Sequence, residues 1–166
     1  MIILSILLVV SYVGITIWRK KELPESISAM VYDLPDGGWR WVWSIWLLLV
    51  DVFTFAPTIE ILEEAHSIGI MGFVPMVLLG FVAVWPLFDK EHLRWHYILS
   101  YIAGIWSQVD VWLMCPWWLF VWLALIVFVG YLLLCNLKQM LSKVVILMEM
   151  TCYIGIVGAI VWHLIN

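Results

Sequence analysis

The chain has 166 residues, of which 66% are hydrophobic and only 12% are charged. A soluble globular domain carries about 45–50% apolar and about 25% charged residues, so a soluble fold of 19.3 kDa could not bury this much apolar surface. The composition excludes a soluble enzyme, a disordered tail and a disulfide scaffold. The eight Lys and Arg residues form no patch that would bind nucleic acid. We therefore expect an all-α integral membrane protein whose first partner is the lipid bilayer.

The sequence contains six apolar segments long enough to cross a bilayer, which takes about 20 residues in a helix. In chain order they span residues 2–18, 39–59, 68–88, 95–114, 117–135 and 144–164. Pro116 lies between the fourth and the fifth. Because proline lacks an N–H and clashes with the preceding turn, a tight hairpin is predicted there. The chain, residues 1–166, is thus predicted to be a single domain, a polytopic bundle of six transmembrane helices.

Positive charges fall on alternate loops of this arrangement. The loops after the first, third and fifth segments hold Arg19, Lys20, Lys21, Arg40, Lys90, Arg94, Lys138 and Lys143. The loop after the second segment instead holds Glu60, Glu63, Glu64 and His66. Since Lys and Arg stay on the cytoplasmic side of a membrane, this pattern predicts a multi-pass protein of the bacterial inner membrane with both termini outside.

Thirteen tryptophans are a high number for this length, and Trp is enriched where a membrane meets water. The cytoplasmic interface is expected to hold Trp18, Trp39, Trp41, Trp43, Trp85 and Trp95. The outer interface is expected to hold Trp112, Trp117, Trp118 and Trp162.

Residues 22–36 connect the first two segments and have apolar residues at helical spacing. These residues are Leu23, Ile27, Met30, Val31 and Leu34, between Pro24 and Pro35. The pattern predicts a short amphipathic helix on the cytoplasmic membrane surface. Two interpretations are open: a simple connector, or a lid over a cavity that faces the cytoplasm.

Three ionisable residues lie at membrane depth, where such groups are costly and by default mark a functional site. They are Asp51, Asp110 and Glu149. On the fourth segment, helical spacing places a set of small or polar residues on one face of the helix: His96, Ser100, Ala103, Ser107 and Asp110. The second segment has a similar face: Ser44, Asp51, Thr54 and Thr58.

A helical rise of 1.5 Å per residue places Asp51 about 18 Å, and Asp110 about 22 Å, along their segments. If the two helices are neighbours, the carboxyl groups could meet and hold a proton or a cation. The alternative is that these groups only form interhelical hydrogen bonds, worth about 0.6 kcal/mol each. The predicted polar site within the membrane comprises Asp51, Asp110, His96, Ser107 and Glu149.

His92 and His96 have the i, i+4 spacing that zinc sites use, but H-x-x-x-H alone is a weak signal. On the outer side, His66, His163 and Asp110 converge only if the packing permits. We therefore expect no metal and no cofactor, and we assign no catalytic residue.

The segments SISAMVYDLP, GFVAVWPLF and HYILSYIAGIWSQ, with the Trp-rich second span, resemble a group of uncharacterised membrane proteins of gut Bacteroidetes and their phages. This resemblance covers about residues 22–113. A looser similarity is to the CREST superfamily of membrane hydrolases that modify lipids with a Ser, an Asp and several His around a metal. Seven spans are usual there, and here the H-x-x-x-H begins the fourth span instead of lying in the last helix.

Three functions are consistent with the sequence. The best supported is an intramembrane polar site that binds or moves a small solute, a lipid or a proton, because carboxyl groups lie at membrane depth. The second is a membrane-embedded lipid hydrolase or transferase. The third is a structural or accessory subunit, which would form a homo-oligomer or join a partner membrane protein.

Overall fold

The computed structural model describes residues 1–21, 24, 26–34, 38–88, 93–135 and 143–165. Within these ranges the chain is helical and has no strand, which confirms the all-α fold class. The helices are α1 (Ile2–Lys20), the 3₁₀ helix η1 (Ser28–Asp33), α2 (Gly38–His66), α3 (Ile70–Phe88), α4 (Leu93–Met114), α5 (Trp118–Leu134) and α7 (Val144–Ile165).

Four of these helices, α1, α2, α3 and α7, are long and apolar enough to cross a membrane. The helix α4 has 22 residues but is not among the four. It carries the face of small and polar residues predicted for the fourth segment, which we call the polar stripe: His96, Ser100, Ala103, Ser107 and Asp110. The helix α5 is apolar, and its 17 residues are at the lower limit for a spanning helix. The structure thus shows a helical protein with several helices suited to a membrane.

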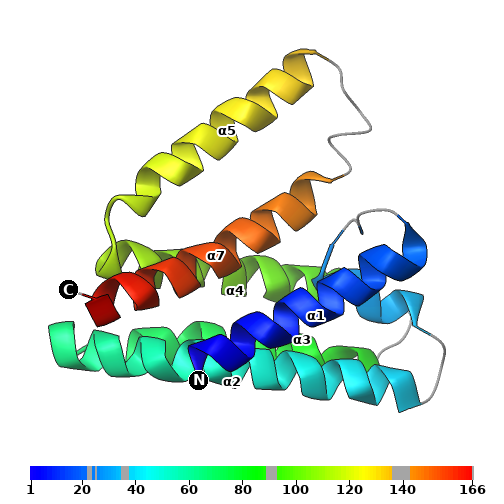
Figure 1. Ribbon diagram of the computed structural model, residues 1–166, viewed down its shortest axis with the longest axis horizontal. Helices are drawn as coiled ribbons and strands as arrows, with labels where there is room; N and C mark the ends of the chain where they lie inside the picture. The colour runs from blue at the N-terminus through cyan, green and yellow to red at the C-terminus, as the bar shows by residue number, and fades with distance from the viewer. Residues whose placement is uncertain (22–23, 25, 35–37, 89–92, 136–142, 166) are drawn as a thin grey trace.

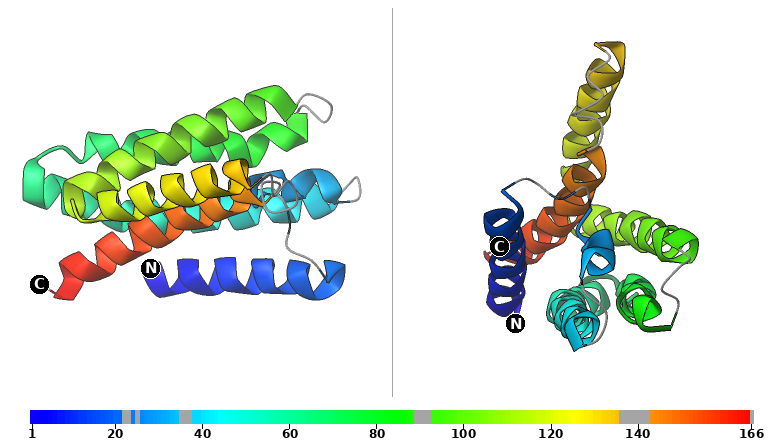
Figure 2. Two further views of the ribbon diagram at one scale, coloured as in Figure 1. Left: turned by 90° about the horizontal axis from the view of Figure 1, so that it is seen from above. Right: turned by 90° about the vertical axis from the view of Figure 1, so that its right-hand side faces the viewer.

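The helices α2, α3 and α4 pack side by side, and α3 runs along both of the others (Figure 1). The helices α1 and α7 complete the bundle, with α1 on α2 and α7 on α4. The helix α5 protrudes from this bundle (Figure 2), and Leu132 is its one buried residue. The apolar side chains of α5 are therefore largely exposed.

Helix ends differ in part from the predicted boundaries. The turn at Pro116 is confirmed, since α4 ends at Met114 and the N–H of Trp118 donates to the Cys115 carbonyl at 3.1 Å. The helix that contains the second predicted span, residues 39–59, continues to His66 as α2. Polar residues on its last turns are exposed, so the helix can carry them beyond the apolar region: Glu60, Glu63, Glu64 and His66.

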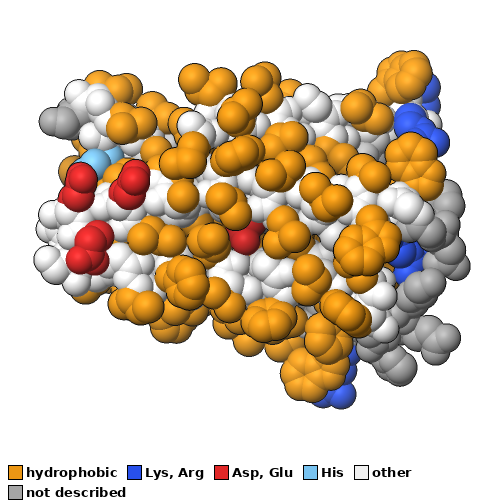
Figure 3. Space-filling view, turned by 90° about the horizontal axis from the view of Figure 1, so that it is seen from below, with side chains coloured by type: hydrophobic (Ala, Val, Ile, Leu, Met, Phe, Trp, Pro, Cys, Tyr) orange, Lys and Arg blue, Asp and Glu red, His pale blue; other side chains and the backbone are white. Residues whose placement is uncertain are grey.

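Charge is separated along the helix axes (Figure 3). The basic end, where α1 finishes and α2, α4 and α7 begin, holds Arg19, Lys20, Lys21, Arg40, Arg94 and Lys143. The acidic end, where α2 finishes, holds Glu60, Glu63, Glu64 and His66. Lys90 and Lys138 lie outside the described residues. The separation follows the predicted loop pattern, while the side of the membrane that each end faces stays a prediction.

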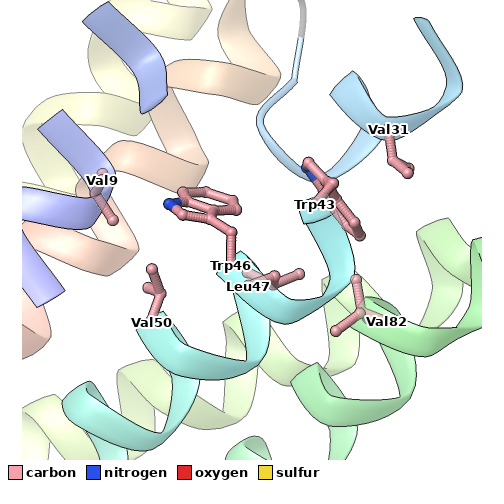
Figure 4. Close-up of a cluster of buried hydrophobic side chains, with 8 residues drawn as sticks. Val9, Val31, Trp43, Trp46, Leu47, Val50 and Val82 are labelled. Atoms are coloured by element: carbon pink, nitrogen blue, oxygen red, sulfur yellow. The ribbon is translucent and has the colours of Figure 1, made fainter. Parts of the chain in front are cut away.

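A hydrophobic cluster fills the bundle near the basic end (Figure 4). Its buried members are Val9, Val31, Trp43, Trp46, Leu47, Val50, Val82 and Ala83. The prediction that Trp43 lies at the membrane interface is wrong, since this residue is 0% exposed and packs in the cluster with Val31 of η1. By contrast Trp18, Trp39, Trp41 and Trp95 are exposed at the basic end, as an interfacial belt requires.

Small residues let helices approach closely at two contacts. A Cβ atom on Gly72 of α3 would lie 3.1 Å from Cγ1 of Ile59 in α2. A Cβ atom on Gly155 of α7 would lie only 2.6 Å from Nε1 of Trp118 in α5. Gly155 therefore provides the space in which the first turn of α5 rests on α7.

Replacing this glycine tests the contact between α5 and α7. Alanine is favoured over glycine in a helix by about 1 kcal/mol, so Gly158→Ala, with nothing within 4 Å of the new Cβ, should leave the thermal midpoint unchanged or higher. Gly155→Ala should lower the midpoint because Trp118 must move. Thermal unfolding of both variants in detergent micelles is the measurement, and equal midpoints would contradict the contact.

Candidate functional site

A cavity of about 380 Å³ lies within the bundle and is bounded by residues of α1, η1, α2, α3, α4, α5 and α7. Much of its wall is apolar, including Val9, Leu47, Val50, Phe55, Leu79 and Ile156. Its polar lining residues are Ser28, Asp51, Thr54, Tyr97, Ser100, Tyr101, Ser107, Gln108, Glu149, Cys152 and Tyr153. A mainly apolar wall with a few polar groups is typical of sites for small molecules.

Asp51 is an acidic residue of α2 in this cavity. It belongs to the polar face predicted for the second span, and all four members of that face are buried: Ser44, Asp51, Thr54 and Thr58. Asp51 itself is 3% exposed, and its Oδ1 has no hydrogen-bond partner among the described residues. Burying a charge without a partner is unfavourable, so this carboxyl group requires a proton or a ligand that donates to it.

Asp110 does not share this site. It is 0% exposed but does not line the cavity, and both of its oxygens lack a hydrogen-bond partner within the described part of the chain. Asp110 therefore forms no hydrogen bond with Asp51, a pairing that the sequence left open. The helices α2 and α4 each pack mainly along α3, and their direct contact is limited.

His96 is also fully buried and outside the cavity. Its ring lies edge-on to Tyr32 of η1, with centroids 5.3 Å apart, and 6.3 Å from the Trp43 ring. Among the described residues, no three His, Cys, Asp or Glu side chains are placed to hold a metal ion. His92 lies outside these residues, so the predicted pairing of His92 with His96 is untested.

The polar stripe of α4 faces the interior as predicted. Its fully or nearly fully buried members are His96, Ala103, Ser107 and Asp110, while Ile102, Ile105 and Trp112 on the other face are exposed. The hydroxyl of Ser100 donates to the His96 carbonyl and that of Ser107 donates to the Gly104 carbonyl, both at 2.8 Å. These serines thus bond to their own helix, an arrangement that does not activate a nucleophile.

Glu149 of α7 binds the chain segment before and within η1. Its Oε1 accepts hydrogen bonds from the hydroxyl groups of Ser26 at 2.8 Å and Ser28 at 2.6 Å, and from the Ser28 N–H at 3.3 Å. Its Oε2 accepts a hydrogen bond from the N–H of Ile27. One carboxylate therefore satisfies the donors at the start of η1, which we call the Glu149 latch.

The latch explains why one sequence prediction is wrong. Residues 22–36 were expected to lie on the membrane surface as an amphipathic helix. Pro24, Ser26, Met30 and Val31 are instead buried, and η1 is the regular structure among the described residues of this segment. Leu23 lies outside the described residues. Since Ile27 and Ser28 line the cavity, the alternative interpretation of this segment as a lid agrees with the structure.

Gln108 has a role that the sequence did not reveal. Its Oε1 accepts hydrogen bonds from the indole N–H groups of Trp118 at 3.1 Å and Trp122 at 2.8 Å. Its Nε2 donates to the Cys152 carbonyl at 3.3 Å. Gln108 thereby ties α4 to α5 and α7 beside the cavity. The available signal in the sequence is an amide side chain within an apolar segment.

A chain of three hydroxyl groups connects helices on the other side of the cavity. The Ser5 hydroxyl lies 2.7 Å from Oγ1 of Thr54 and 2.8 Å from the Tyr153 hydroxyl. These contacts join α1, α2 and α7. Neither Ser5 nor Tyr153 was a candidate from sequence, because a single hydroxyl in an apolar span carries no periodic signal.

Comparison of the chain with family models, curated proteins and solved structures finds no match.

Removing the latch tests its hold on η1. In a background without native cysteines, a Val31→Cys thiol should be protected from a water-soluble maleimide, because Val31 is fully buried. Adding Glu149→Ala leaves the donors at Ile27 and Ser28 without an acceptor and should increase the labelling rate several-fold. Glu64→Ala, at an exposed position, is the matched control. Equal labelling in both variants would show that Glu149 does not hold η1 in place.

Proposed function

We propose that this protein is a six-span protein of the bacterial inner membrane that binds a small molecule in a cavity within the bilayer. The separation of basic and acidic ends supports this topology, with the basic end in the cytoplasm and both termini outside. In this arrangement α4 is stabilised as a span because its polar face is turned into the bundle. The helix α5 crosses as the outermost span.

The observation that carries the proposal is the Asp51 carboxyl group. Asp51 lines a mainly apolar cavity, is 3% exposed, and has an Oδ1 without a hydrogen-bond partner among the described residues. An unpaired buried carboxyl group does not stabilise the folded protein. Replacing it with an apolar side chain would remove the free-energy cost of taking the carboxyl group out of water. A ligand that donates a hydrogen bond, or a proton that is taken up and released, accounts for its presence.

Movement of the ligand across the membrane is part of this proposal. The cavity is covered towards the basic end by η1, which the Glu149 latch holds by several hydrogen bonds. Release of these bonds would connect the cavity with the cytoplasm. The hydroxyl groups of Thr54 and Tyr153 line the cavity and offer further polar contacts to a solute or a proton.

The hydrolase alternative has weaker support, since Ser100 and Ser107 donate to their own helix. A homo-oligomer or a partner membrane protein stays a prediction. The exposed apolar surface of α5 is compatible with either.

Native mass spectrometry of protein released from nanodiscs tests binding at Asp51. Wild-type protein should retain a co-purified molecule, and Asp51→Asn should lose it because the amide places a donor where the ligand needs an acceptor. Asp110→Asn is the matched control, since Asp110 is equally buried but outside the cavity. The same bound mass in wild type and Asp51→Asn, or its loss in Asp110→Asn alone, would contradict the proposal.

A further inference from the structure

The cavity reaches the lateral surface of the bundle at α4. Two of its lining residues on this helix, Tyr101 and Ile105, are 51% and 69% exposed. A residue that both lines a cavity and faces outwards marks an opening in the wall. In a membrane-spanning bundle, an opening on this surface leads into the lipid and not into water.

The helix α5 forms one side of this opening. Its first turns are held to α4 by the hydrogen bonds of Trp118 and Trp122 to Gln108. From there α5 diverges from α7, so that the two helices form a wedge (Figure 1). A second cavity of about 230 Å³ lies between α4 and the start of α5, and it shares Ile105, Gln108 and Trp122 with the main cavity.

The opposite route, along the helix axes from the basic end, is obstructed. The residues of η1 that cover it are packed tightly, with Met30 3% and Val31 0% exposed. The Glu149 latch fixes the start of η1 at the edge of the cavity, where Ile27 and Ser28 line it. A molecule dissolved in the bilayer therefore has an open path, whereas a molecule from the cytoplasm must first displace η1.

We propose that the ligand is a single-chain amphiphile with an amine or hydroxyl head group, which enters from the bilayer between α4 and α5. This inference rests on the proposed function, binding at Asp51. The head group donates to Asp51, and the chain lies along the apolar walls towards Ile105. A volume of about 380 Å³ is near the lower limit for sites of small ligands, which favours one chain over a two-chain lipid.

Photo-crosslinking in phosphatidylcholine vesicles tests this inference, with a diazirine-bearing dodecylamine as the probe. Wild-type protein should give crosslinks on the cavity residues of α4 and α7. Excess dodecylamine should abolish them, and the same excess of dodecane, which has no donor, should not. Asp51→Asn should lose the crosslinks as well.

Substitutions at the opening test the route. Ile105→Trp should abolish crosslinking because the larger side chain fills the opening, and Ile105→Ala should increase it. Ile102→Trp is the matched control, since Ile102 is an exposed residue of the same helix that does not line the cavity. Both positions face outwards, so neither tryptophan has to be accommodated in the core.

The outcomes separate this inference from the proposed function. If Ile105→Trp leaves the crosslinking unchanged, the ligand does not enter from the bilayer at this position. If dodecane competes as well as dodecylamine, the ligand does not need a head group that donates a hydrogen bond. If Asp51→Asn still removes the co-purified molecule in native mass spectrometry, binding at Asp51 stands in both cases. If wild type and Asp51→Asn carry the same bound mass, the proposed function itself fails.

Discussion

In a bilayer, a polar group on an apolar helix has no water to bond with and is stabilised by a partner inside the bundle. Two clusters of hydrogen bonds in this structure provide such partners. Glu149 draws the donors of Ser26, Ile27 and Ser28 onto α7, so that η1 is buried. Gln108 gathers two indole N–H groups and thereby attaches the start of α5. Asp51 stands out because it faces a cavity with one oxygen unpaired among the described residues.

The bundle combines a closed end with an open side. The hydrophobic cluster and the Glu149 latch close the basic end, where Trp43 and Val31 are fully buried. On the side, α5 contacts the bundle mainly through its first turns and leaves Ile105 exposed. Glu149 accepts four hydrogen bonds at the closed end, whereas the first turns of α5 are held to Gln108 by two.

Periodic features of this fold could be predicted from the sequence. The spacing of His96, Ser107 and Asp110 indicates one helix face, and that face is buried in the structure. Pro116 correctly indicates the hairpin between α4 and α5. These predictions succeed because they depend on neighbours within a helix or a turn, for which residue order fixes the geometry.

Features that depend on distant contacts could not be predicted in this way. The burial of η1 depends on Glu149, more than a hundred residues further along the chain, and the periodicity of the segment alone favoured a surface helix. The distance of Asp51 and Asp110 along their segments predicts a similar depth for both residues. It does not show that α2 and α4 pack mainly along α3. The role of Gln108 in joining α4 to α5 could not be predicted, because its partners, Trp118 and Trp122, lie beyond the hairpin.

The reactivity of Asp51 with dicyclohexylcarbodiimide tests whether this residue lies in a cavity that is reached from the bilayer. This apolar reagent adds to a protonated carboxyl group and forms a stable acylurea, which peptide mass spectrometry locates. Asp51 should be modified and Asp110 should not, because Asp110 is also buried but does not line the cavity. An unmodified Asp51, or modification of Asp110 in its place, would show that Asp51 is not reached from the bilayer.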